Sequence, residues 1–271
     1  MLSYQQPPRT VQEQVSSLSA SEQEALASLR SYWSSKSNSA SPPTVFYDDY
    51  MLLRFLRASP GATKFNLSTA TKVSESYLKW SNECHIHGQT LEQVLCELEK
   101  EIYVVGPGNP QRNRDGHATL YFRPSRMIAK ETNPIELLRG VTYQLTKMTE
   151  EEYTAVNGVC ILTDMTGWAP AANFSLPLTQ ALLGIMQGKF PCRIRRLVVY
   201  NAPLSATVLW GAVKPFFGEL AKKLVFVNKQ TIHQEFPDLN SLPVSMGGKL
   251  DLTATSKRFI QHHQAKTTVR I

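Results

Sequence analysis

The hydrophobic pattern of this chain changes its period near residue 101, and this change constrains the fold more than any other feature. Before it, apolar residues recur at the three- and four-residue spacing of helices, as in Leu26, Leu29 and Trp33. After it, short apolar runs alternate with helical patterns. The sequence therefore predicts an all-helical first part followed by an α/β layer.

The second part contains the runs that we interpret as strands. Those at 158–162, 197–200 and 224–227 are almost wholly apolar, which is typical of strands buried on both faces. Further β-like runs lie at 102–105 and 117–122. Helical patterns separate the later runs, so we expect a mixed sheet with mostly parallel strands.

Both ends of the chain are polar. Residues 1–17 hold two prolines and few other apolar side chains, so we expect a flexible N-terminus. Residues 254–271 form a basic tail that we expect to order only on a partner. Between them, the change of period divides the chain into a helical module at 18–100 and an α/β domain at 101–253.

Positive charge is concentrated between Lys189 and Lys229. This stretch has eight lysines and arginines and one acid, Glu219, and its +7 equals the formal net charge of all 271 residues. Within it, Leu197 to Val213 carries no charge. A cationic patch beside a long apolar segment suits a lipid or an anionic membrane surface. We do not expect nucleic acid as a partner, because zinc-finger spacings, Arg-rich tracts and aromatic–lysine repeats are missing.

We expect the chain to be cytoplasmic and to meet membranes only at their surface. Its four cysteines include no C-x-x-C pair, which favours a reducing compartment. The N-terminus lacks the apolar core of a secretory signal. Residues 165–188 carry no charge, but Pro170 and Pro177 argue against a membrane span. Any membrane association is therefore expected to be peripheral.

The helix expected at Ser205 to Phe217 is apolar around most of its circumference. Such a helix is either fully buried or faces an apolar surface that is not protein. Its 13 residues are too few to span a bilayer. Two interpretations stay open: a central core helix, or a movable lid over a lipid cavity with hinge freedom at Gly211 and Gly218.

No motif in the chain predicts catalysis. It contains no G-x-S-x-G elbow, H-E-x-x-H, P-loop or Rossmann glycine pattern. Cys84, His85 and His87 have no second pair of metal ligands nearby, so we interpret them as a surface cluster. Cys160 is interpreted as a buried small hydrophobe and Asp164 as a turn or capping acid. We expect neither an enzyme nor a metal site, and no cofactor beyond a bound lipid.

An ordered series of short motifs carries a resemblance to a known family. Over residues 45–250 the chain resembles the CRAL-TRIO family of lipid-binding proteins, which includes phosphatidylinositol transfer proteins and tocopherol and retinaldehyde carriers. Its C-terminal half is also similar to the lipid-binding domain of certain protein tyrosine phosphatases, without a phosphatase signature. The motifs are Leu52 to Ala58, Phe65-Asn66, Tyr77 to Trp80, Asp115-Gly116, Leu120 to Phe122, Asp164 to Gly167, Gly188 to Pro191, Asn201 to Pro203, Lys214 to Phe216 and Leu242 to Gly248.

The resemblance implies a small helical module on a lipid-binding domain whose sheet forms the floor of a hydrophobic cavity. A gate helix covers this cavity in the family, and it maps onto Ser205 to Phe217. The period of two in a strand leaves open which face of the sheet meets the ligand. The gate residues we expect are Val208, Leu209, Ala212, Val213 and Phe216. The cavity residues we expect are Leu120, Phe122, Cys160, Leu162, Leu183, Met186 and Val198.

The resemblance also bears on anionic headgroups. Phosphatidylinositol-binding members tend to carry Glu where this chain has Cys192, and a Lys at the position of Lys223, so half of the inositol site is present. Tocopherol-carrier relatives instead have basic residues that bind phosphoinositide headgroups on the membrane surface. Arg193, Arg195 and Lys214 match that arrangement better. The residues we expect to contact anionic headgroups are Arg193, Arg195, Lys214, Lys222 and Lys223.

The resemblance leads us to expect a monomeric, non-catalytic protein that binds a hydrophobic ligand and transfers it between membranes. The ligand expected first is a phospholipid such as phosphatidylinositol or phosphatidylcholine, with docking on anionic phosphoinositide membranes. Burial of its chains would give affinity of about 0.8 kcal/mol per methylene. Two alternatives stay open: a carrier of a tocopherol- or retinoid-like isoprenoid, and a protein-recognition scaffold without lipid exchange.

Overall fold

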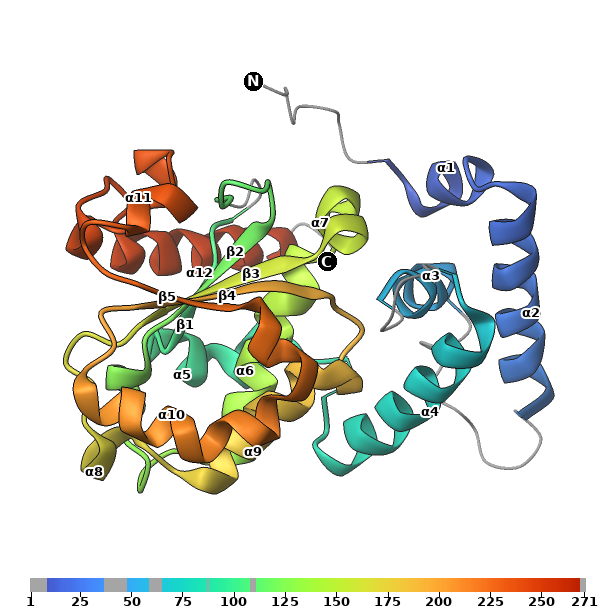
Figure 1. Cartoon of the computed structure of the whole chain (residues 1–271). Coiled ribbons are helices and arrows are strands. Elements are labelled where there is room, and N and C mark those ends of the chain that lie inside the picture. The colour runs from blue at the N-terminus through green and yellow to red at the C-terminus, as the bar shows by residue number, and fades with distance from the viewer. Residues whose placement is uncertain (1–8, 37–47, 59–64, 87, 108–110, 269–271) are drawn as a thin grey trace.

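The N-terminal helices form a group beside the sheet (Figure 1). The structure is a computed structural model, and it describes residues 9–36, 48–58, 65–86, 88–107 and 111–268, with the backbone alone at 266–268. Asn66 accepts a hydrogen bond from the Thr69 amide and so caps the last helix of the group. The helices are α1 (Val11–Ser16), α2 (Ala20–Lys36), α3 (Asp49–Ala58) and α4 (Leu67–Glu83).

A five-stranded sheet forms the centre of the second part, with its strands in the order β1-β2-β3-β4-β5. β1 is antiparallel to β2, and every other neighbouring pair is parallel. This confirms the mixed, mostly parallel sheet predicted from the apolar runs. The strands are β1 (Tyr103–Val104), β2 (Ala118–Phe122), β3 (Val159–Asp164), β4 (Ile194–Tyr200) and β5 (Leu224–Val227).

The helices that connect the parallel strands cover one face of the sheet (Figure 1). Strands that follow one another in sequence are also neighbours in space, so each connection crosses over the same face. The elements between β2 and β5 are η2 (Pro124–Arg126), α6 (Pro134–Met148), α7 (Glu152–Asn157), α8 (Pro170–Asn173), α9 (Leu176–Gly184), the π-helical turn η3 (Ile185–Lys189), α10 (Leu204–Phe217) and η4 (Gly218–Lys223).

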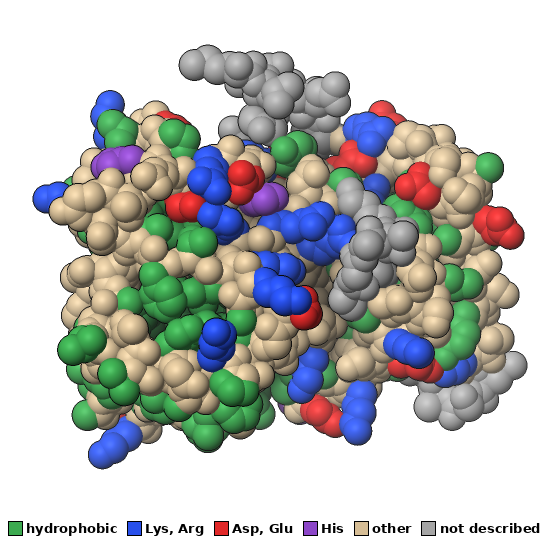
Figure 2. Space-filling view, in the orientation of Figure 1, with side chains coloured by type: hydrophobic (Ala, Val, Ile, Leu, Met, Phe, Trp, Pro, Cys, Tyr) green, Lys and Arg blue, Asp and Glu red, His purple; other side chains and the backbone are tan. Residues whose placement is uncertain are grey.

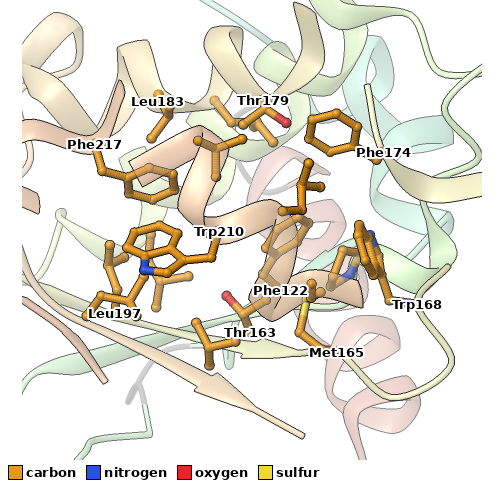
Figure 3. Close-up of a pocket in the computed structure, with 18 of the residues that line it drawn as sticks. Phe122, Thr163, Met165, Trp168, Phe174, Thr179, Leu183, Leu197, Trp210 and Phe217 are labelled. Carbon is orange, nitrogen blue, oxygen red and sulfur yellow. The ribbon is translucent and has the colours of Figure 1, made fainter. Parts of the chain in front are cut away.

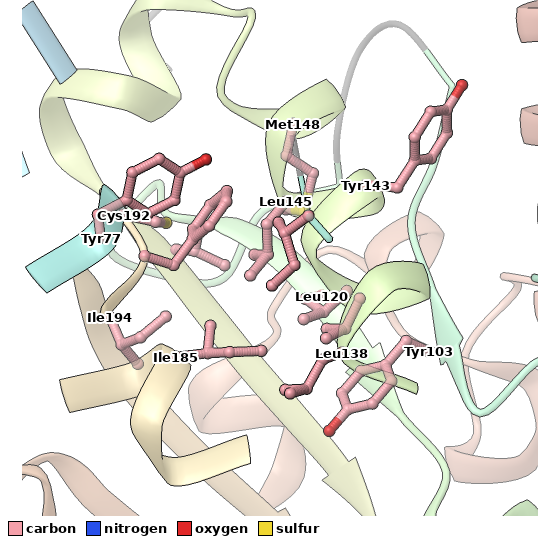
Figure 4. Packing of buried hydrophobic residues seen from close by; sticks show 14 of the residues in the cluster. Tyr77, Tyr103, Leu120, Leu138, Tyr143, Leu145, Met148, Ile185, Cys192 and Ile194 are labelled. Carbon is pink, nitrogen blue, oxygen red and sulfur yellow. The ribbon is translucent and has the colours of Figure 1, made fainter. Parts of the chain in front are cut away.

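Each face of the sheet has its own hydrophobic core. The larger core joins the connecting helices to the N-terminal group, and Figure 4 shows Tyr77 of α4 beside Cys192, within the cluster around Leu120 and Leu145. The smaller core lies on the opposite face, where Ile232 and Phe236 pack on the strands. The segment on that face holds α11 (Ile232–Glu235), η5 (Leu239–Ser241), η6 (Val244–Met246) and the start of α12 (Leu252–Thr268).

The structure differs from the sequence-based expectations at both ends of the helical module. Residues 1–8 of the expected flexible N-terminus lie outside the described residues, but residues 9–17 include helix α1. Thr10 caps this helix, and Arg9, just before it, forms an ion pair with Glu152 at 2.6 Å. The division at residue 100 stays a prediction, but α5 (Leu91–Glu99) packs against α6 and α12 rather than against α1–α4.

The basic C-terminal tail is also more ordered than expected. Residues 254–268 form most of α12, and the side chains of Phe259 and His263 on this helix are buried. The apolar side of this helix packs against α5 and β1. Among the helices of the described ranges, none combines the length and apolar character needed to cross a bilayer.

Candidate functional site: an apolar cavity under helix α10

A cavity of about 190 Å³ lies between the sheet and the helices α8, α9 and α10. Its floor is the sheet face that carries the connecting helices. The strands contribute side chains at alternate positions, as the period of two requires. The floor residues are Phe122 of β2, Ile161 and Thr163 of β3, Leu197 and Val199 of β4, and Leu224 and Phe226 of β5.

The walls come from α9, η3 and the loop that follows β3. Trp168 and Phe174 lie on one side of the cavity, and Leu183 lies on another (Figure 3). The loop begins at the carboxyl end of β3, which is where open parallel sheets place their ligand sites. The other wall residues are Pro124, Met127, Met165, Asn173, Thr179, Leu182 and Met186.

Helix α10 covers the cavity but is itself poorly buried. None of its residues is fully buried. Leu204 and Val208 point to solvent with 81% and 73% of their surface exposed. The inner side is aromatic: Trp210 meets the ring of Phe217 edge-to-face, with centroids 4.7 Å apart. An apolar helix with this much exposed surface is more weakly held than a core helix, which favours the lid interpretation over the core one.

The lining contains no charged side chain. The one side-chain amide of the lining, that of Asn173, accepts from the Ala169 amide and uses both of its donors on the carbonyls of Ser125 and Met127. The Thr179 hydroxyl donates to the Ser175 carbonyl. The cavity therefore suits an uncharged, largely apolar molecule, because burying an unpaired charge here would be costly.

The structure places three of the seven expected cavity residues on the lining: Phe122, Leu183 and Met186. Leu120 lies on the same face of β2 as Phe122, but it is fully covered within the larger core.

The other three expected cavity residues require a correction. Cys160, Leu162 and Val198 belong to the smaller core on the opposite face, against Phe236 and Leu242. These strands are apolar on both faces, so their sequence does not show which side the connecting helices cover. Burial raises the pKa of the Cys160 thiol, in keeping with its interpretation as a buried hydrophobe.

Sequence reasoning missed the residues one position away, above all Ile161, Thr163 and Leu197. The pairing of Leu120 with Ile161 in the sheet would have given the correct face, but register is a property of the folded sheet. Trp168 and Phe174 could have been found, because they are aromatic residues that follow the carboxyl end of a predicted strand.

The expected gate residues divide between the two sides of α10. Leu209 and Val213 face the cavity. Val208, Ala212 and Phe216 lie on the exposed side of the helix. The helical period explains the division, because positions 208, 212 and 216 are four residues apart and share one face.

The structure brings together three of the five expected headgroup residues. Arg193 and Arg195 flank the start of β4, and Lys223 directly precedes β5, with its Nζ donating to the Ile194 carbonyl at 2.8 Å. Burial and the two arginines lower the pKa of Lys223, and burial and Arg195 lower that of Arg193. We call Arg193, Arg195 and Lys223 the cationic cluster.

The remaining two basic residues have other surroundings. Lys222 forms an exposed ion pair with Glu219 at 2.8 Å, and Lys214 is an exposed residue of α10. Arg196, which the strand period directs to the opposite face, forms an ion pair with Glu235 at 2.5 Å there. Figure 2 shows lysine and arginine side chains gathered near the middle of one face, with hydrophobic side chains over the region of α10.

The described residues contain no group of three or more His, Cys, Asp or Glu side chains that could hold a metal ion. Cys84 and His85 follow α4 directly, whereas His87, the third member of the cluster considered from the sequence, lies outside the described residues.

A family model described as the CRAL/TRIO domain matches residues 108–248, just over half of the chain. The chain belongs to the CRAL/TRIO domain family. This confirms the resemblance drawn from the motifs, and it places the chain in a family whose members bind hydrophobic lipid ligands. The matched residues include β2 to β5, α10 and the cavity between them.

Known relatives agree with this assignment. The chain is 30% identical over 211 residues to a mouse protein named alpha-tocopherol transfer protein-like, covering 74% of this chain and 58% of the relative. It is 22% identical to human clavesin-2 over 79% of this chain and 67% of the relative. A third match is mouse tyrosine-protein phosphatase non-receptor type 9, 25% identical over 46% of this chain and 21% of the relative.

The fold also matches that of a solved structure. The crystal structure of Sfh5 superposes with a TM-score of 0.51 and 13% sequence identity, covering 93% of this chain and 99% of that one. At this identity the match speaks for the fold alone, and it confirms the CRAL-TRIO fold expected from the motifs.

Proposed function

We propose that this chain binds one hydrophobic ligand in the cavity under α10 and carries it between membranes without catalysing a reaction. The observation that carries the proposal is an uncharged cavity closed by a helix that has no fully buried residue. Apolar walls supply affinity, at about 0.8 kcal/mol per buried methylene. The relatives named alpha-tocopherol transfer protein-like support a transfer role.

Loading requires α10 to move outwards. The cavity of about 190 Å³ is smaller than the roughly 300–1,000 Å³ of most ligand sites. Gly218 ends the helix with a positive φ of 50°, a conformation that glycine adopts readily and that suits a hinge. We therefore propose that α10 is the gate, and that Leu209 and Val213 line its inner side.

The lining favours an isoprenoid-like ligand over a phospholipid. A phospholipid carries a charged phosphate, and no side chain of the lining could compensate it. Its headgroup would have to stay outside the cavity. A tocopherol- or retinoid-like molecule instead has one small polar group on an apolar skeleton, which this lining can bury.

We also propose that two neighbouring features dock the protein on an anionic, phosphoinositide-containing membrane. Leu204, Val208 and Phe216 expose apolar surface on the outer side of α10. Arg195 and Lys223 of the cationic cluster add positive charge, and Figure 2 shows lysine and arginine side chains on the same face as the hydrophobic side chains over α10. Docking there would put the gate against the lipid, as expected for a cytoplasmic peripheral protein.

The test is to extract the purified protein with organic solvent and to identify bound lipid by mass spectrometry. We expect one stoichiometric species, and two variants of α10 check where it binds. Val213→Trp fills the cavity from its inner side and should abolish the bound lipid. Val208→Trp adds the same bulk on the outer side and should retain it.

An empty extract, repeated after incubation with mixed liposomes, would contradict the proposal and favour a protein-recognition scaffold. Retention of the lipid by both tryptophan variants would show that the ligand binds elsewhere.

A further inference from the structure

Thr163 stands out among the polar residues of the cavity. Its side chain projects from the floor between Phe122 and Trp210 (Figure 3). In the sheet it lies between Phe122 of β2 and Val199 of β4, which are both apolar. Its hydroxyl makes no hydrogen bond with any described residue, although a threonine hydroxyl can both donate and accept.

The other polar side chains of the lining have less free capacity to hydrogen-bond a ligand. Asn173 and Thr179 are engaged with backbone carbonyls and an amide, as described above. Trp168 and Trp210 add indole N–H groups, which can only donate. Thr163 is therefore the one lining hydroxyl or amide that makes no side-chain hydrogen bond within the described residues, so it can both donate to a ligand hydroxyl and accept from it.

We infer that Thr163 selects a ligand bearing one uncharged hydroxyl group on an otherwise apolar skeleton. The inference rests on the proposed function, because it concerns the same cavity. A hydroxyl buried among hydrocarbon loses its hydrogen bonds to water, and Thr163 can replace them. A hydrocarbon ligand would instead leave the Thr163 hydroxyl unsatisfied. A charged headgroup would gain too little from a single neutral hydroxyl.

The substitution Thr163→Val tests this cleanly. Valine has nearly the same shape and the same preference for strands, so the variant should fold. We would titrate wild type and variant with retinol and with the hydrocarbon that lacks its hydroxyl. Quenching of Trp168 and Trp210, which line the cavity, reports binding. We expect Thr163→Val to weaken retinol binding roughly 3- to 10-fold, the range of one net hydrogen bond. Binding of the hydrocarbon should stay equal or tighten.

Thr179→Val is the matched control. It removes a lining hydroxyl that already has its partner in Ser175, and it should change the binding of both probes by the same factor. Equal weakening of both probes by Thr163→Val would assign Thr163 to packing alone and overturn the inference. An unchanged retinol affinity would overturn it as well.

A separate measurement distinguishes this failure from failure of the proposed function. If wild-type protein binds neither probe and yields no lipid on extraction, the cavity is not a ligand site and both proposals fail. If extraction yields a phospholipid, the proposed function stands and the selection of a single-hydroxyl ligand is wrong.

Discussion

At the scale of single residues, two arginines on α3 show how differently a buried cation can be accommodated. Arg57 donates to Gln14 at 2.8 Å and to Glu152 at 3.3 Å. Arg54, one turn earlier, is 3% exposed and lies over the ring of Phe190. Its Nε and Nη2 have no hydrogen-bond partner among the described residues. The guanidinium group of Arg57 therefore has hydrogen-bond partners, whereas burial of the Arg54 guanidinium costs folding free energy because part of it has none.

We predict opposite effects for the same substitution at these two positions. Arg54→Met keeps the length of the side chain and removes an unsatisfied cation, so it should raise the free energy of unfolding by about 1 kcal/mol. Arg57→Met leaves Glu152 and Gln14 short of a partner and should lower it by about 2–4 kcal/mol. Urea denaturation measures both, and destabilisation of similar size by the two variants would contradict this interpretation.

At the scale of elements, α10 depends on few polar restraints. Its first turn has no side-chain cap, and Pro215 interrupts its hydrogen bonding near the end. Among the described residues, one side-chain hydrogen bond ties it to a separate element: Gln187 donates to the Phe216 carbonyl. Gln187 lies in the π-helical turn η3, a local widening of the helix that often occurs at functional sites. Helix α10 is thus held by its apolar side and, among the side-chain hydrogen bonds of the described residues, by the exposed one from Gln187.

We predict that Gln187→Met loosens the gate. Methionine keeps the length of glutamine but cannot donate, so amide hydrogen exchange in 205–217 should quicken about twofold to fivefold, the lower range for one hydrogen bond. Gln187→Lys retains a donor and should restore slow exchange. Gln230→Ala, at an exposed position outside α10 and η3, is the control. Unchanged exchange in Gln187→Met would show that apolar contacts alone hold α10.

At the scale of the whole molecule, the fold brings cations that are far apart in the sequence close together in space. The cationic cluster comes from the amino ends of β4 and β5, which lie side by side because the strands are parallel. Gly158, the residue before β3, lets the start of β4 lie close to it, because a Cβ there would lie 2.5 Å from the Arg193 carbonyl oxygen. Parallel pairing therefore gathers cations that are about 30 residues apart in the sequence.

We predict that Arg193→Ala with Arg195→Ala weakens binding to phosphoinositide-containing vesicles roughly 10- to 30-fold, at about 1 kcal/mol per cation near an anionic surface. Added salt should weaken wild-type binding and reduce this difference, since it screens the charges. A matched control is Lys100→Ala with Lys147→Ala, which removes the same charge elsewhere. Vesicle co-sedimentation measures all three proteins. Equal losses in both double variants would show that net charge, and not the cluster, governs binding.

Much of this architecture could be predicted from the sequence. The helical spacing of Leu26, Leu29 and Trp33 and the continuous apolar strands depend on local chemistry, and both are found in the structure. The side of α10 that faces the sheet could not be predicted, because the helix is apolar nearly all round. The face of the sheet on which Cys160 lies could not be predicted either: the strand alternation puts Cys160 and Leu162 on one face, but that face carries the smaller core and not the cavity.

The sequence by itself therefore determined the type of element, the family and the concentration of charge, because period, caps and charge are written along the chain. Only the tertiary structure decided which sheet face carries the cavity. That choice follows from crossover connections that all cover one face, a property of strand order and not of any strand. The same crossovers bring Thr163 of β3 beneath α10 and align the amino ends of β4 and β5, so both candidate sites arise from the topology.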